Sequence, residues 1–258
     1  MAGTTPLNRR RILCITAAAL SAAIGWFLPD WILPENPAFS AVCIAVAMQE
    51  ILLLLVPAAA LFAMNGDPVA QVRALVQKVN AYFAGMTMLA AVSFSLTGAL
   101  ITAIFYMVLT QVGINPALPP SFVPKNLGEL ALAGLSMAAV TAVCEEVFFR
   151  GLIQGSLRKR LSENASMWVT AILFALLHFS LLGFPVILFV GLILSRLMAQ
   201  RGILLPILFH ALYNFAIILI NYSGTTPNLG AMILCLVIFV FASRLLFLDD
   251  KKEVSHEM

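Results

Sequence analysis

Long apolar runs, broken by short polar segments, occupy most of this chain. Because a helix needs about 20 mostly apolar residues to cross a bilayer, the pattern predicts an all-α protein, a polytopic membrane helix bundle with about eight transmembrane helices. The predicted spans are residues 12–28, 37–64, 83–113, 127–157, 166–182, 184–200, 203–221 and 229–247. Gly183 and Pro185 separate the fifth span from the sixth, which predicts either a tight helical hairpin or one broken element.

The composition agrees with a membrane protein. Hydrophobic residues make up 62% of the 258 residues and charged residues 10%, whereas a soluble domain carries about 25% charged residues. The four cysteines are scattered through apolar segments without a CxxC pair, so they indicate neither a disulfide framework nor a zinc knuckle. Because the net charge is only +3 and no long basic block occurs, we expect no binding to nucleic acid.

The basic residues fall on one side of the predicted bundle. When the connections between eight spans are numbered alternately, the outer set contains Lys125 alone, and Arg150 lies within a span. Cytoplasmic loops of membrane proteins are enriched in Lys and Arg, so the pattern predicts both termini in the cytoplasm (N-in/C-in). The inner set comprises Arg9, Arg10, Arg11, Arg73, Lys78, Arg158, Lys159, Arg160, Arg196, Arg201, Arg244, Lys251 and Lys252.

A few polar side chains interrupt the apolar spans, although a charge at the bilayer centre costs about 2.5–3.5 kcal/mol on insertion scales. Glu146 and Arg150 are four residues apart and therefore face each other across one helical turn, while Glu145 is rotated by about 100° from Glu146. These side chains are Glu50, Glu145, Glu146, Arg150, His178, His210 and Asn214. Counted from the predicted cytoplasmic ends, Glu145 and His178 lie at a depth of about 20 Å, and His210 and Asn214 at about 12 and 18 Å. The three helices could therefore bring them into one cavity.

Such a cluster is suited to hydrolysis of an amide. A carboxylate in an apolar pocket can act as a general base, an imidazole beside it can orient a water molecule, and a second imidazole with an amide can donate to a developing oxyanion. The same set could instead hold Zn²⁺ or another divalent ion, with Glu145, His178 and His210 as ligands. The residues alone leave both routes open.

Three short motifs follow one another on separate predicted spans: EEVFFR at 145–150, FALLH at 174–178 and HALYN at 210–214. In this order they resemble EExxxR, FxxxH and HxxxN, the motifs of the CAAX protease and bacteriocin-processing (CPBP/ABI) family of intramembrane proteases. The resemblance implies that Glu145 activates water, that His178 helps to hold it, and that His210 and Asn214 form the oxyanion site. Glu146 and Arg150 are then a supporting ion pair.

The resemblance covers about residues 127–221, and composition and charge define the regions on either side. Residues 1–126 hold the N-terminal transmembrane helices, with an interfacial cytoplasmic segment at 67–80. Residues 127–221 form the catalytic transmembrane core, and residues 222–258 the last transmembrane helix and a charged cytoplasmic tail.

The function expected from the resemblance is that of an intramembrane endopeptidase, with CAAX-type processing of C-termini as one form of it. No cofactor is favoured, although zinc stays an alternative, and the expected partners are membrane lipid and a peptide or protein substrate, lipidated in the CAAX case. The short loops favour a prokaryotic cytoplasmic membrane. Two alternatives are a non-catalytic scaffold or bacteriocin-immunity protein on the same fold, and a transporter with a Glu/His proton relay, although no internal repeat supports the transporter. Glu50 lies outside the motifs and either pairs with Arg196, lines the cavity or lies nearer an interface.

Overall fold

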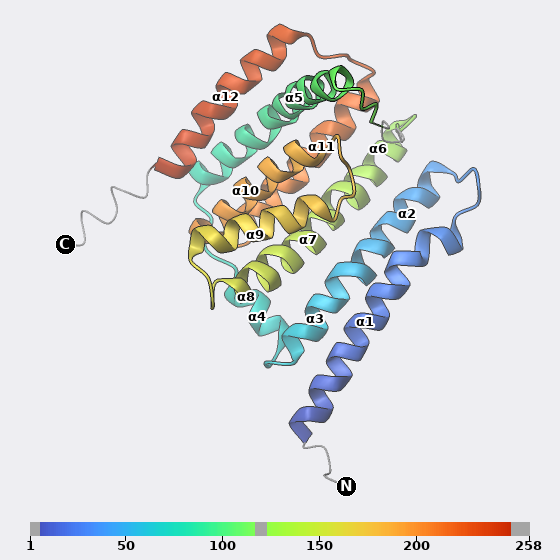
Figure 1. Cartoon of the computed structure of the whole chain (residues 1–258), viewed down its shortest axis with the longest axis vertical. Coiled ribbons are helices and arrows are strands. Elements are labelled where there is room, and N and C mark those ends of the chain that lie inside the picture. The colour runs from blue at the N-terminus through green and yellow to red at the C-terminus, as the bar shows by residue number, and fades with distance from the viewer. Residues whose placement is uncertain (1–5, 117–122, 249–258) are drawn as a thin grey trace, which may run out of the picture.

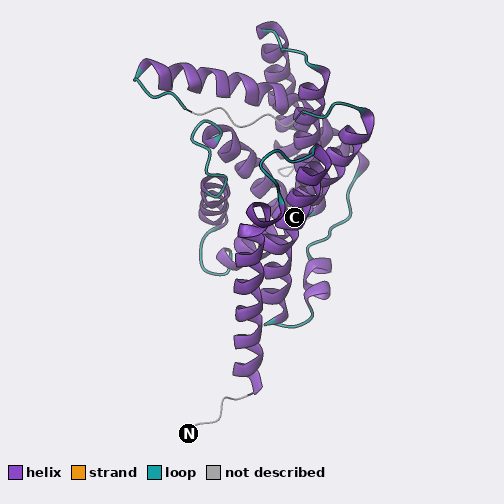
Figure 2. Ribbon diagram, turned by 90° about the vertical axis from the view of Figure 1, so that its right-hand side faces the viewer, coloured by secondary structure: helices purple, strands orange, loops and turns teal. Residues whose placement is uncertain are grey.

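The computed structural model of the chain describes residues 6–116 and 123–248, and this part contains helices and no strand (Figures 1 and 2). Seven helical stretches in it are long and apolar enough to cross a membrane, which confirms a polytopic helical bundle. They are Asn8–Ile32, Phe39–Ala63, Ala81–Gln111, Leu127–Leu157, Phe184–Arg201, Leu204–Ser223 and Leu229–Phe247. The polar tail predicted at 249–258 lies outside the described residues.

The prediction of a full span at 166–182 is wrong. This region forms α9 (Glu163–Leu176), whose 14 residues extend only about 21 Å at 1.5 Å per residue. The helix stops because the His178 ring bonds the carbonyl of Phe174 at 2.7 Å, and because Phe179 turns the backbone into the left-handed region at φ 49°. A turn then leads into α10 (Phe184–Arg201), which packs along α9, so the two form the hairpin that was one of the alternatives.

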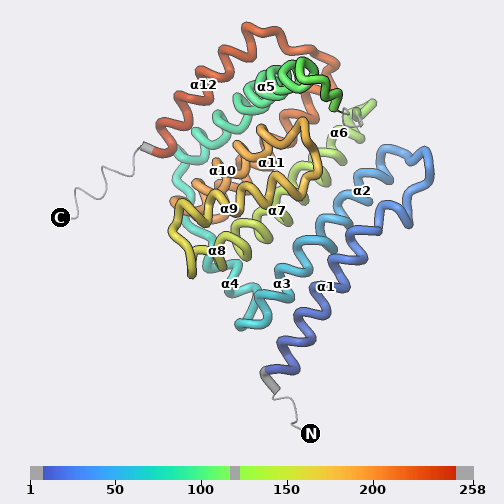
Figure 3. The backbone as a smooth tube through the Cα atoms, in the orientation of Figure 1, coloured from blue at the N-terminus to red at the C-terminus, as the bar shows by residue number. Residues whose placement is uncertain are grey.

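The helices form three groups that lie side by side (Figures 1 and 3). On one side α1 (Pro6–Ile32) packs along the bent helix made of α2 (Phe39–Glu50), η1 (Ile51–Leu55) and α3 (Val56–Ala63). On the other side α5 (Ala81–Gln111) packs against α11 (Leu204–Ser223) and α12 (Leu229–Leu248).

The central group contains the segment with the two adjacent glutamates. It is one continuous helix from Leu127 to Leu157, built from α6 (Leu127–Ala133), η2 (Gly134–Val140), α7 (Thr141–Glu146), η3 (Val147–Gln154) and α8 (Gly155–Leu157). The segments η1, η2 and η3 are π-helical, a wider winding that is often found at functional sites. Helices α9, α10 and α11 pack against this central helix, so the three motifs meet within the bundle.

Polar caps begin the helices that follow the loops. Asp67 caps the short helix α4 (Pro68–Ala74), Asn80 caps α5 and Ser162 caps α9, each by accepting a bond from a backbone N–H in the first turn. At the start of α6, Asn126 accepts from the N–H of Glu129, while the carboxylate of Glu129 accepts from the N–H of Lys125. Each cap satisfies backbone groups that apolar surroundings would leave without a partner.

Helix α1 lies directly on the backbone of η1. A Cβ added to Gly25 would be only 2.6 Å from the nitrogen of Leu53, so only glycine allows this approach. One turn earlier, Ser21 donates its hydroxyl to the carbonyl of Leu52 at 2.7 Å. The contact places α1 beside the C-terminal end of α2, next to the residue Glu50.

Candidate active site

The two glutamates of the first motif are both buried but take different partners. Glu146 is 0% exposed and Glu145 is 7% exposed. Because they are successive residues of α7, their side chains diverge by about 100° around the helix. Glu146 points to the ion pair with Arg150, whereas one carboxylate oxygen of Glu145, Oε2, has no hydrogen-bond partner within the described protein.

Glu146 joins Arg150 to His210. Its Oε1 accepts one bond from Nη1 of Arg150 at 3.0 Å and a second from Nδ1 of His210 at 2.9 Å. The other ring nitrogen of His210, Nε2, lies 3.6 Å from Oε2 of Glu145. His210 therefore stands between the two glutamates, and the paired Glu146 holds its ring in place.

Two hydrogen bonds, four residues apart on each helix, fix this motif to α10. Nη2 of Arg150 donates to the carbonyl of Gly191 at 3.2 Å, and Nε2 of Gln154 donates to the carbonyl of Ser195 at 3.0 Å. Both donors are 0% exposed. Gly191 also allows α9 to approach closely, because a Cβ there would lie 3.1 Å from Ala171 of α9. The absence of a side chain at 191 thus lets α9, α10 and η3 meet closely.

His178 lies in the turn after α9, on the exposed side of the site. Its Nδ1 is 2.7 Å from the carbonyl oxygen of Phe174. A carbonyl oxygen accepts only, so Nδ1 carries the proton, and in the neutral ring Nε2 is left as an acceptor. The positive φ of the next residue, Phe179, costs about 1 kcal/mol and is part of the turn that holds this ring.

Phe174 is the aromatic centre of the site. Its ring makes edge contacts with His178 (centroids 4.7 Å apart), with His210 (5.9 Å) and with Phe149 (5.1 Å). The guanidinium carbon of Arg150 stands 4.4 Å from the centroid of the same ring. One buried side chain therefore positions both imidazoles and the buried cation, a role that the sequence analysis did not assign to it.

A cavity of about 540 Å³ opens beside these groups and joins Glu145 to His178. Glu50, at the end of α2, lines the same cavity, as one of the three sequence alternatives had it. The rings of Trp26 and Phe179 meet edge to face at 5.7 Å on its lining. Apolar and aromatic side chains complete it: Ala22, Leu53, Leu54, Phe148, Phe149 and Leu177, together with the polar Gln49.

Asn214 lies one turn beyond His210 on α11. Its Nδ2 donates to the carbonyl of Met137 in η2 at 3.3 Å, and the residue is not among those that line the cavity. His210 also lies behind the cavity wall, in contact with Glu145. Of the residues named from the sequence, the cavity therefore brings together Glu145, His178 and Glu50.

Across residues 6–116 and 123–248, no group of three or more His, Cys, Asp or Glu side chains is placed to hold a metal. In both candidate histidines Nδ1 is engaged, in His210 by Glu146 and in His178 by the carbonyl of Phe174, so Nε2 is the ring nitrogen left for a ligand or a water.

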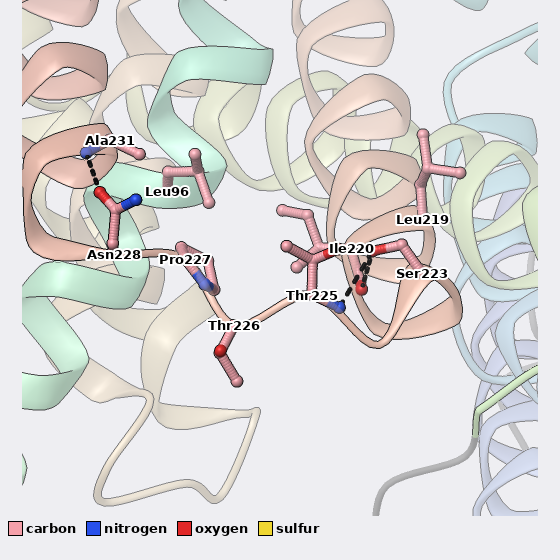
Figure 4. Close-up of a pocket in the computed structure, with 9 residues that line it drawn as sticks. All are labelled: Leu96, Leu219, Ile220, Ser223, Thr225, Thr226, Pro227, Asn228 and Ala231. Carbon is pink, nitrogen blue, oxygen red and sulfur yellow. Dashed lines mark hydrogen bonds between the residues drawn. The ribbon is translucent and has the colours of Figure 1, made fainter.

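Another cavity, of about 410 Å³, lies at the connection between α11 and α12 (Figure 4). Its polar side chains make local turn contacts, such as Asn228 with the N–H of Ala231 and Ser223 with Thr225 (Figure 4). None of the nine residues that line it is an acid or a base. This cavity therefore lacks the chemistry found beside Glu145.

The three motifs lie within a segment that matches a known protein family. Residues 127–216 match the family described as type II CAAX prenyl endopeptidase Rce1-like. This segment is similar to that family, and we refer to it as the Rce1-like domain. Comparison with curated proteins and with solved structures found no match.

The Rce1-like domain confirms the resemblance drawn from the motifs. The family is one of CAAX-type proteases, so the activity shown at family level is hydrolysis of a peptide or protein substrate. Together with the seven apolar helices, it identifies an integral, multi-pass membrane protein. Phe174, Gly191 and Gln154 support the Rce1-like domain through tertiary contacts; the motif pattern marked only Phe174, as the first letter of FxxxH, and gave no signal for the other two.

Proposed function

We propose that the chain is an intramembrane endopeptidase in which Glu145 activates a water molecule. The observation that carries the proposal is the cavity in which Glu145 and His178 meet. The carboxylate of Glu145 and Nε2 of neutral His178 are both acceptors on residues that line this cavity. Oε2 of Glu145 is buried toward His210, so the water would contact the other carboxylate oxygen. A water between Glu145 and His178 can give one hydrogen to each and keep a lone pair for attack on a carbonyl carbon.

The reaction then needs one proton to move twice. As the water oxygen bonds to the carbonyl carbon, its proton passes to Glu145. When the tetrahedral intermediate collapses, the carbon–nitrogen bond breaks and Glu145 gives this proton to the leaving amine. The carboxylate of Glu145 is restored, and the products are one new C-terminus and one new N-terminus.

His210 and Asn214 are the proposed donors to the oxyanion. Nε2 of His210 can donate only from the imidazolium form, because Nδ1 already donates to Glu146. In that form the charges of Glu145, Glu146, Arg150 and His210 sum to zero, which suits a low-dielectric site. Asn214 gives one N–H to Met137 and keeps a second N–H for the proposed oxyanion, although in this structure the residue does not line the cavity.

The proposed substrate is a peptide that reaches the cavity at the membrane, with a lipidated C-terminal peptide as the CAAX-type case. The lining is mostly apolar and aromatic, which suits a substrate that arrives from lipid. We place the chain in a prokaryotic cytoplasmic membrane with both termini inside. This orientation requires α9 and α10 together to return the chain to the side on which α9 begins, although α9 has only 14 residues.

The test is cleavage of an internally quenched peptide with a farnesylated cysteine and three following residues, by purified protein in detergent. Glu145→Gln should lower kcat by about 10²–10⁴, because it removes the general base while keeping the shape of the side chain. Glu163→Gln, on the exposed end of α9, is the matched control and should cleave like the wild type. Wild-type cleavage that persists in Glu145→Gln would overturn the mechanism. Loss of wild-type cleavage in a chelator would favour a metal route, and absence of cleavage by the wild type would favour the scaffold or immunity alternative.

A further inference from the structure

Glu50 is an acidic side chain that the three motifs do not explain. It ends α2, and the helix continues through the π-helical segment η1. α2 and η1 pack against α7, so Glu50 and Glu145 come from neighbouring helices of the bundle (Figure 1). Both carboxyl groups line the cavity that His178 also lines. The site therefore has a second acidic wall, contributed from outside the Rce1-like domain.

The carboxyl group of Glu50 has no structural partner that would account for it. Its Oε2 is buried, yet no hydrogen bond or ion pair involves the side chain in the described residues. Arg196, considered as a partner on sequence grounds, makes no ion pair with it. An unpaired carboxyl group within an apolar bundle is costly, and acidic residues at membrane depth usually mark a functional site.

A peptide that enters this cavity needs an acceptor of this kind. The bond to be cleaved must lie in an extended segment, and the N–H groups on either side of it then lose their helical partners. In a cavity with a mostly apolar lining, an N–H group without an acceptor is costly. In the proposed mechanism, Glu145, His178 and His210 contact the water and the carbonyl oxygen, so none of them accepts a hydrogen bond from these N–H groups.

We propose that Glu50 positions the substrate by accepting a hydrogen bond from a backbone N–H next to the scissile peptide bond. The inference rests on the proposed protease function and adds a residue to it. A carboxyl group can accept such a bond whether or not it is protonated, so the role does not depend on its charge. Gln49 is the neighbouring polar residue on the same wall and provides the comparison.

The experiment is a double-mutant cycle between the protein and the peptide. The probes are the farnesylated quenched peptide and two analogues, each with an ester in place of the peptide bond on one side of the scissile bond. An ester has no N–H, so one analogue should lower kcat/KM of the wild type about tenfold. The same ester should cost less than twofold in Glu50→Leu, and should keep its full cost in Glu50→Gln, whose amide oxygen still accepts.

The outcomes separate this inference from the proposed function. Ester and Glu50→Leu effects that simply multiply, for both analogues, would overturn the role of Glu50, as would coupling to Gln49→Leu in its place. The same cycle, measured as the Kd of the probes on the Glu145→Gln protein, gives a result that does not need turnover. Cleavage that survives in Glu145→Gln would refute the base but leave the Glu50 cycle readable.

Discussion

Replacement of Arg150 by methionine tests whether the buried ion pair holds the site together. Arg150 and Glu146 are both 0% exposed, and their closest nitrogen and oxygen are 3.0 Å apart. At an effective dielectric constant of about 20, Coulomb's law gives about 5.5 kcal/mol for such a pair. Removal of one partner from a buried pair costs about 3–5 kcal/mol in practice, because it leaves the other charge buried alone. We therefore expect Arg150→Met to lower the free energy of unfolding by about 3–5 kcal/mol.

The assay is reversible unfolding of the purified protein in mixed micelles with increasing SDS, followed by fluorescence or circular dichroism. Arg158→Met is the control, since Arg158 pairs with Glu163 at 2.9 Å but both side chains are more than one third exposed; such pairs contribute about 0–1 kcal/mol.

The double variant Glu146→Gln with Arg150→Met removes both charges and keeps an acceptor for His210. It should recover most of the loss, because no charge is then buried without a partner. Equal effects of Arg150→Met and Arg158→Met, or a double variant less stable than Arg150→Met, would refute the reasoning.

Two further predictions concern the N-terminal helices and the orientation. Gly25→Ala should destabilise the protein by about 1–3 kcal/mol, because its Cβ would press on the backbone of Leu53. Gly85→Ala, with open space around it, is the control and should be neutral or slightly stabilising. Thermal unfolding in detergent would measure both, and equal shifts in the unfolding temperature would contradict the contact at Gly25. In a variant without native cysteines, a membrane-impermeant maleimide added to intact cells should label Lys125→Cys and leave Arg160→Cys unlabelled, and the reverse pattern would disprove the N-in/C-in orientation.

Much of the bundle could be predicted because its signals are local. Long apolar runs locate the spans, and the i,i+4 spacing of Glu146 and Arg150 anticipates their ion pair, which the structure contains. The end of α9 could not be predicted in this way, since it depends on the His178 ring taking the carbonyl of Phe174. An apolar run of 17 residues contains no sign of that bond.

The place of Glu50 on the wall that α2 contributes was one of three alternatives, and the sequence could not choose among them for a different reason. Glu50 comes near Glu145 through the packing of two helices that are far apart in sequence, and the close approach at Gly25 helps to fix α1 beside them. For Asn214 the sequence predicts the helix face but not the hydrogen-bond partner. Its spacing from His210 places both on one helix face, but the amide bonds the carbonyl of Met137, on another helix.

The two hydrogen bonds between η3 and α10 also constrain insertions and deletions in these two helices. Arg150 and Gln154 are four residues apart, and so are their acceptors, Gly191 and Ser195. An insertion or deletion of one residue between the two hydrogen bonds, on either helix, would rotate one donor or acceptor around its helix axis and keep only the other bond. The lengths of segments 150–154 and 191–195 are therefore tied to each other, and such a change in one requires a compensating change in the other.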